Sequence, residues 1–304
     1  MHNRVMKKLP LLLFIGLISV SAFGQNDRQQ LDDTETAFIS TLASRGQKAA
    51  FLSVLADDAV MFHNGPTRAR DYWTGRQDSP LLLTRTQAFS DVSSNGQLGY
   101  TTGSWRTATR EKDPVYKYGE YVTIWERRQK TGFRVVLDMV TIHPPYQPGE
   151  VKKMSISPNR SVDVNKKGYS ATNSAMRFLG LGAGGGNLAT AYEFSSQDDV
   201  RLIVDFLPPI LGKKRVLTEA KEYKSLIVPS NLAIYQSGDM AYFWHPCSYD
   251  NSVEGTENGN CLHIMKLRKK QWWIVFSMFA RQESEAPPVL RTKEGDSSKK
   301  PPVH

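Results

Sequence analysis

The sequence lacks three features that would each indicate a different class of protein. The apolar run from Leu9 to Val20 is shorter than the roughly 18 residues of a membrane anchor, and no cysteine comes directly after it, which argues against a lipid-anchored bacterial lipoprotein. The excess positive charge, +9 over 304 residues, is scattered instead of concentrated on one face among aromatics, so no nucleic-acid partner is predicted. No His or Cys pair has the short ligand spacing of a zinc site, so neither a metal nor a cofactor is predicted.

The N-terminus has the pattern of a secretory signal peptide. Basic residues precede the apolar run, and Ala22-Phe23-Gly24 provides a small-x-small cleavage site before Gln25. Polar residues follow at once, unlike the flank of a membrane span. We therefore predict removal of residues 1–24 and a secreted or periplasmic location, with no membrane attachment after cleavage. The net charge then falls from +9 to +6, because the removed segment carries three basic residues and no acidic one.

The rest of the chain contains an internal repeat at a spacing of about 140 residues. The landmarks, each with its later counterpart, are Phe38 with Phe178, Gly46 with Gly186, Asp58 with Asp198, Val60 with Val200, and 95–100 with 237–242. A period this long indicates a duplicated domain and not a solenoid, whose units are much shorter.

The repeat and the composition together predict the domain boundaries. The first domain spans 25–145, and a polar, proline-rich linker occupies 146–171. The second domain spans 172–282, and a tail at 283–304, rich in Pro, Lys and Ser, is predicted to be disordered.

Each domain reads as helices followed by strands, which indicates an α+β fold. In the first domain, helical spacing on both sides of Gly46 predicts two helices joined at that glycine, followed by a strand at 59–62 and a helix within 69–83. Four further strands are predicted, at 87–93, 99–108, 119–128 and 133–142. We expect two tandem cone-shaped domains, each with N-terminal helices packed on a curved, mainly antiparallel sheet. The second domain has a G-x-G-x-x-G within 180–186, but a helical segment precedes it, which favours a flexible junction over a dinucleotide site.

Three motifs carry a resemblance to a known family. The stretches 55–62, 119–125 and 132–138 resemble the SnoaL-like branch of the nuclear transport factor 2-like superfamily, and the likeness covers most of 27–145 and, more weakly, 172–282. That superfamily includes isomerases, cyclases, hydrolases and non-catalytic binding or assembly modules, so the resemblance does not select a function. The carboxylate base of the ketosteroid isomerase pattern falls at His63 and its oxyanion tyrosine at about Ile39, so that machinery is absent.

The candidate catalytic residues are His63 and Asp138. His63 follows an apolar strand, where it is either a pocket imidazole or a strand-end residue bonded to backbone. Asp138 ends an apolar run, so it either pairs with an arginine such as Arg106 or faces a cavity.

The candidate ligand-binding aromatics are Tyr100, Trp105 and Tyr121, which lie on neighbouring predicted strands and could equally be core. The second domain has Ile203, Cys261 and Ser277 at the positions of His63, Tyr121 and Asp138. Any ligand site is therefore predicted in the first domain, because a pocket needs a few convergent polar groups.

Cys247 and Cys261 are the only cysteines, and they fall on neighbouring predicted strands. Export favours a disulfide between them over two buried thiols.

Three functions remain open from the sequence. The first is an exported protein that binds a small molecule in a polar pocket of the first domain. The second is a hydrolase, isomerase or cyclase that uses His63 or Asp138 as general base. The third is a structural or assembly module in which the sheets mediate pairing of the two domains, or of two chains in a homodimer.

Overall fold

A computed structural model describes residues 19–62, 65–109, 114–146, 170–184, 187–225, 229, 232–251 and 255–282. The described residues do not include His63, residues 1–18 of the predicted signal peptide, nearly all of the predicted linker or any of the predicted tail. Within the described part of the chain, no helix is long and apolar enough to cross a membrane.

The N-terminal unit, residues 19–146, begins with helices and continues as a sheet. Its elements are α1 (Ser19–Val54), β1 (Leu55–Phe62), β2 (Pro66–Arg68), α2 (Ala69–Gly75), β3 (Leu82–Val92), β4 (Leu98–Ala108), β5 (Val115–Arg128) and β6 (Gly132–Val140). The long helix α1 is two helices that meet at Gly46, whose φ of 83° lies in the left-handed region that favours glycine. The predicted junction is therefore confirmed.

The C-terminal unit, residues 170–282, repeats this order of helices and strands. Its elements are α3 (Ala171–Ala183), α4 (Leu188–Ser195), β7 (Ser196–Val204), β8 (Ile210–Leu211), α5 (Lys213–Ala220), β9 (Tyr223–Ser225), β10 (Ile234–Ser237), β11 (Met240–Asn251), β12 (Gly255–Arg268) and β13 (Gln271–Arg281). Gly180 and Gly182 lie inside α3, so a helix and not a strand carries the start of the glycine-rich segment.

The two sheets share one topology. The first has the order β2-β1-β6-β5-β4-β3, and the second, read from its other end, has β8-β7-β13-β12-β11-β10, with β9 also paired to β11. The first long strand of each unit runs parallel to the last, β1 with β6 and β7 with β13, whereas the other pairings are antiparallel. The fold is α+β, with helices packed on curled sheets, as predicted.

The helix predicted within 69–83 is confirmed, but the strand predicted at 87–93 begins earlier than expected. The helix expected within 69–83 ends at Gly75, and β3 already begins at Leu82. Gly75 weakens the helix and Pro80 disfavours helical backbone at the residue before it, so the chain leaves the helix and enters the sheet.

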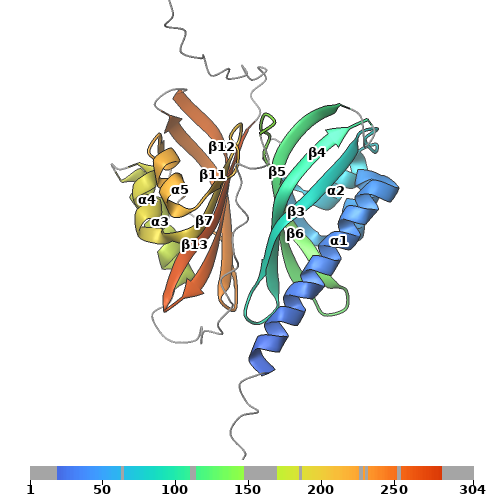
Figure 1. The fold of residues 1–304 in the computed structure, drawn as a ribbon, viewed down its shortest axis with the longest axis horizontal. Coiled ribbons are helices and arrows are strands. Elements are labelled where there is room, and N and C mark those ends of the chain that lie inside the picture. Colours follow the sequence, from blue (N-terminus) through green and yellow to red (C-terminus); the bar gives the residue numbers. More distant parts are fainter. Residues whose placement is uncertain are drawn as a thin grey trace, which may run out of the picture.

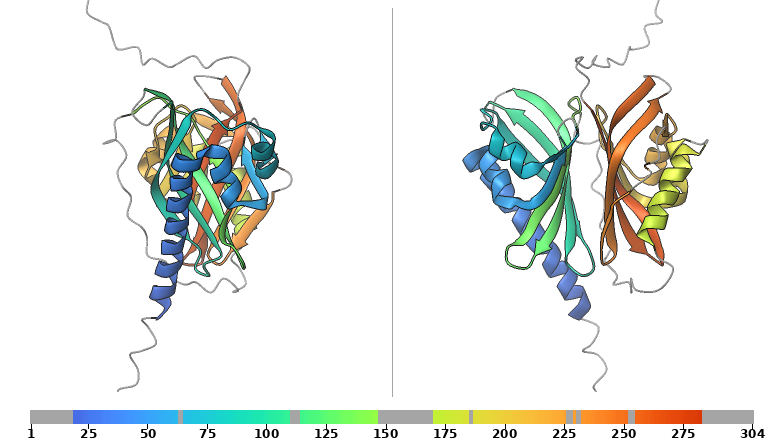
Figure 2. Two further views of the ribbon diagram at one scale, coloured as in Figure 1. Left: turned by 90° about the vertical axis from the view of Figure 1, so that its right-hand side faces the viewer. Right: turned by 180° about the vertical axis from the view of Figure 1, so that it is seen from behind.

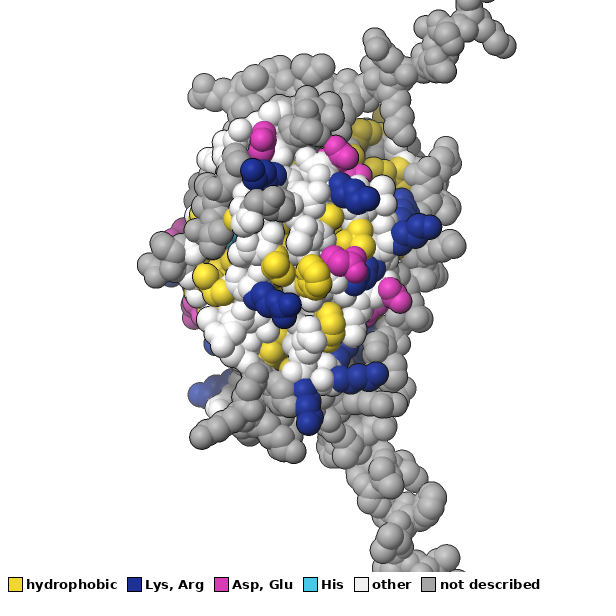
Figure 3. Space-filling view, turned by 90° about the vertical axis from the view of Figure 1, so that its left-hand side faces the viewer, with side chains coloured by type: hydrophobic (Ala, Val, Ile, Leu, Met, Phe, Trp, Pro, Cys, Tyr) yellow, Lys and Arg dark blue, Asp and Glu magenta, His cyan; other side chains and the backbone are white. Residues whose placement is uncertain are grey.

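The two sheets face one another, and the helices cover their outer sides (Figure 1 and, from behind, Figure 2). One apolar cluster joins residues of both sheets, and its cross-unit contacts include Tyr100 with Phe276 at 6.0 Å and Phe62 with Trp244 at 5.3 Å between ring centroids. A second cluster fills the space between α3, α4, α5 and the second sheet. Figure 3 looks onto that helical side, where apolar side chains lie among Lys and Arg.

The contact between the units is close to two-fold symmetric. Asn95 Nδ2 donates to Ser237 Oγ at 3.0 Å, and these residues are 142 positions apart, the spacing that relates the two repeated turns. A residue that meets its own counterpart is the mark of a self-complementary interface. Beside this contact, the buried Lys266 amine lies 3.4 Å from Asp91 and 3.3 Å from Asp239, so an ion cluster links the units.

Candidate functional site

The interior of the N-terminal unit holds a buried ion pair. Arg85, on β3, donates from Nη1 and Nη2 to the two carboxylate oxygens of Asp138, on β6, at 2.9 Å each. Thr123 Oγ1 donates to Asp138 at 2.7 Å, and the Arg85 and Asp138 side chains are only 2% and 4% exposed. Burial alone would lower the pKa of Arg85, but the charge and hydrogen bonds of Asp138 outweigh it and leave that pKa raised.

A second carboxyl group, Glu35 of α1, lies beside this pair. Tyr121 Oη and Thr101 Oγ1 each donate to Glu35 at 2.9 Å, and the Arg85 guanidinium lies 4.4 Å from the centre of the Tyr121 ring. Burial raises the pKa of Glu35, and the charge of Arg85 with the two hydrogen bonds only partly offsets it. Glu35 is fully buried, and this burial disfavours its charged form relative to a carboxyl group in water.

These contacts show what surrounds three of the predicted site residues. The sequence left two interpretations of Asp138 open, and the structure has the one in which Asp138 pairs with an arginine. The partner is Arg85 and not Arg106. Tyr121 lies in the same interior network, and its hydroxyl is bonded to Glu35. Tyr100 is buried where the two sheets meet, against Phe89 and Phe276. His63 lies outside the described residues, so its role as a catalytic base stays a prediction.

A separate cleft opens on the other face of the same sheet. Strand register pairs Thr84 with Arg106, Arg106 with Tyr118, and Tyr118 with His143, so four side chains form one row across the sheet. Paired residues of neighbouring strands point to the same face. Tyr100 is on this face of β4 too, by strand alternation.

The cleft has the size and lining of a small-molecule site. Its volume is about 360 Å³, within the range usual for ligand pockets. Its lining combines hydroxyl groups, aromatic rings and one cation, namely Thr84, Thr86, Ser104, Trp105, Arg106, Tyr118, His143, Pro145 and Tyr146. Arg106 forms no ion pair with any residue of the described ranges, so its charge is available to a ligand.

His143 and Tyr146 form one wall of the cleft and are held by Glu120. Tyr146 Oη donates to Glu120 Oε1 at 3.0 Å, and His143 Nε2 lies 3.5 Å from the same oxygen. His143 Nδ1 is 2.7 Å from the carbonyl of Pro144, so Nδ1 carries the hydrogen. Burial lowers the pKa of His143, but Glu120 and the carbonyls of Pro144 and Gly119 outweigh it, and the net pKa is raised.

Trp105, which is among the residues that line the cleft, lies opposite a glycine. Register pairs Trp105 with Gly119, and a Cβ on Gly119 would collide with the Trp105 indole and the Thr141 carbonyl. The Trp105 indole nitrogen donates to that carbonyl at 3.1 Å. Among the predicted aromatics, Trp105 is the one that lines the cleft.

The C-terminal unit carries different chemistry at matching positions. A disulfide joins Cys247 and Cys261, the pairing that the sequence predicts, with Cα atoms 5.9 Å apart. The position of Asp138 is Ser277, which contacts His263 at 2.8 Å. The interior of this unit is thus mainly apolar, with a histidine where the first unit has Thr123.

Comparison with known proteins gives fold-level likeness only. No family model matches the chain, and no curated protein matches it. Solved structures that match part of it include a cystatin-like protein of unknown function from Nostoc punctiforme, with 14% identity over 38% of this chain and 90% of that one, at a TM-score of 0.30. A nuclear transport factor 2-like protein from Cytophaga hutchinsonii matches with 14% identity over 36% of this chain and 93% of that one, at a TM-score of 0.30. A nuclear transport factor 2-like superfamily protein from Salmonella enterica matches with 13% identity over 42% and 99%, also at 0.30.

Proposed function

We propose that the protein binds a small, partly apolar molecule that carries an anionic group, in the cleft lined by Arg106. The observation that carries this proposal is the row formed by Thr84, Arg106, Tyr118 and His143, which places between hydroxyl and aromatic groups a cation that has no ion-pair partner among the described residues. A guanidinium binds carboxylates in a planar, two-pronged geometry, and aromatic walls accept the apolar part of the molecule. An aromatic carboxylate fits both features.

The same residues favour binding over catalysis. Nδ1 of His143 is held by the Pro144 carbonyl, and Nε2 is buried, 3.5 Å from Glu120 and without a hydrogen bond, which opposes proton exchange with a substrate in the cleft. Asp138 receives hydrogen bonds from Arg85 and Thr123 inside the unit, which opposes its use as a general base. Catalysis through His63 remains the alternative.

Domain duplication and export are also part of the proposal. We infer two tandem copies of a SnoaL-like domain, bounded at 25–145 and 172–282, in a protein exported by cleavage after residue 24. The shared strand order of the two sheets and the contact between Asn95 and Ser237 support the duplication. The N-terminal sequence pattern supports export.

Native mass spectrometry of the purified chain, followed by calorimetric titration with benzoate and phenylacetate, tests the proposed site. Arg106→Ala is expected to weaken binding of these probes by about 10- to 100-fold, the equivalent of a lost charged hydrogen bond of about 1.5–3 kcal/mol. Lys117→Ala is the matched control, because it removes a cation from the same region of the sheet at a position that strand alternation directs to the other face. Equal affinity in wild type and Arg106→Ala, or equal losses in both variants, would reject this cleft as the anion site.

A further inference from the structure

Two neighbouring strands of the C-terminal unit bring histidines and cysteines together on one face. β11 carries His245-Pro246-Cys247 and β12 carries Cys261-Leu262-His263, and the register places His245 opposite Cys261. One ligating atom from each of His245, Cys261 and His263 lies within 4.8 Å of the other two, and all three residues are buried. Cys247 is bonded to Cys261, so its sulfur belongs to the same cluster.

Each histidine has one buried ring nitrogen without a partner. Nδ1 of His245 is 2.8 Å from the Pro246 carbonyl, which can only accept, so Nδ1 carries the hydrogen and Nε2 is left with a lone pair. Nδ1 of His263 is held by Ser277 Oγ at 2.8 Å. Nε2 of both rings has no hydrogen-bond partner, although each residue is only 2% exposed.

This arrangement is the one expected of metal-binding histidines. Histidine ligands commonly use one nitrogen for the metal and give the other to a carbonyl or side chain that fixes the ring. An unpartnered polar atom costs free energy in the interior, and a metal ion would remove that cost.

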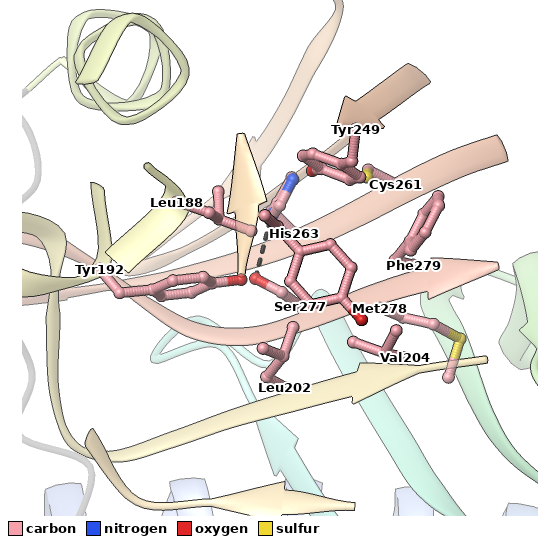
Figure 4. A pocket seen from close by; sticks show the side chains of 11 residues that line it. Leu188, Tyr192, Leu202, Val204, Tyr249, Cys261, His263, Ser277, Met278 and Phe279 are labelled. Carbon is pink, nitrogen blue, oxygen red and sulfur yellow. Dashed lines mark hydrogen bonds between the residues drawn. The ribbon is translucent and has the colours of Figure 1, made fainter. Parts of the chain in front are cut away.

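The small cavity next to the cluster adjoins two of its four residues, His263 and Cys261, and has no room for an organic ligand. A cavity of about 10 Å³ is lined by His263, Cys261, Tyr249 and Ser277 together with apolar side chains (Figure 4). That volume corresponds to about one water molecule. The donor set of imidazole and thiolate selects zinc over magnesium or calcium, which prefer oxygen.

We propose that reduction of the Cys247–Cys261 disulfide creates a Cys₂His₂ site in which His245, Cys247, Cys261 and His263 bind one zinc ion. A sulfur atom in a disulfide is not a thiolate, so the bridge and the metal are alternative states of the same four residues. With a phosphine as reductant, the sulfur–sulfur bond breaks, the phosphine takes the oxygen of one water molecule and becomes its oxide, and the water's two protons give two thiols. Zinc binding then releases two protons from these thiols.

Cobalt(II) is the probe of the site, because its thiolate complexes absorb visibly and zinc displaces it. The full chain reduced with a water-soluble phosphine is expected to bind one cobalt ion with a thiolate charge-transfer band, and the oxidised chain is expected to show no such band. Cys247→Ser cannot form the disulfide, so it is expected to bind cobalt without reductant and with a weaker band.

Ligand variants distinguish this site from adventitious binding. His263→Ala is expected to abolish stoichiometric binding, and Ser277→Ala, which removes only the partner of His263 Nδ1, to weaken it by about 10- to 100-fold. His304→Ala, which removes a histidine of the predicted tail, is the matched control and should bind as wild type.

Two results would overturn the proposal. The first is a reduced chain and a folded Cys247→Ser variant that both fail to bind one cobalt ion. The second is unfolding of both proteins, by circular dichroism, that added zinc does not reverse, because the four ligands would then not assemble.

Discussion

Removal of the Asp138 carboxylate should destabilise the fold more than any loss of an exposed ion pair. The Asp138→Ala variant leaves the Arg85 guanidinium buried, with the side chain 2% exposed and both terminal nitrogens deprived of a carboxylate partner. Breaking a buried pair on one side costs about 3–5 kcal/mol. Glu35 remains nearby as a second carboxyl group, so we expect the lower half of that range.

The matched comparisons come from the same unit. Asp58→Ala breaks the pair with Arg128, whose side chains are 73% and 40% exposed, and should cost less than about 1 kcal/mol. The double variant Arg85→Met with Asp138→Leu removes both charges and should recover most of the stability lost in Asp138→Ala, because apolar replacement of a buried pair is often neutral or stabilising.

Urea unfolding at pH 7, followed by tryptophan fluorescence and far-ultraviolet circular dichroism, measures these differences when the two transitions coincide. A loss in Asp138→Ala no greater than in Asp58→Ala would refute the argument that the buried charge is the cause. A double variant as unstable as the single one would refute it as well, because packing would then account for the loss.

Three further predictions concern pH, backbone packing and the disulfide. Burial is the main cause of the raised pKa of Glu35. The contribution of Glu35 to the free energy of unfolding is therefore complete below its ordinary pKa and declines as pH rises through the folded pKa. Urea unfolding measured across pH should show this decline in the wild type and not in Glu35→Gln. Gly119→Ala should destabilise the fold by about 1–3 kcal/mol, because the added Cβ would collide with backbone. Gly180→Ala should stabilise it by about 0.5–1 kcal/mol, because Gly180 is exposed on a helix with open space around it. Thermal melts that rank the two variants in the other order would contradict this packing. Loss of the bridge in Cys247→Ser with Cys261→Ser should cost about 3 kcal/mol, and alkylation of the unreduced wild type should add no adduct by mass.

The sequence by itself determined the local elements and their order. Apolar spacing on both sides of Gly46 predicted two helices joined there, and turn residues such as Asn95-Gly96 separated the strands. The repeat spacing also anticipated that the two units share an order of elements, because similar residue patterns at fixed distances favour the same local structure. The strand predicted at 87–93 begins earlier, at Leu82, two residues after Pro80, which disfavours helical backbone at the residue before it.

Only the tertiary structure decided which side chains meet. Arg85 and Asp138 are 53 residues apart, and their pairing depends on strands β3 and β6 facing one interior, so the sequence could predict an arginine partner without identifying it. The cleft around Arg106 follows from strand register, which no local pattern encodes. The same holds for His245, Cys261 and His263, because short ligand spacing along one segment misses a site that two paired strands assemble.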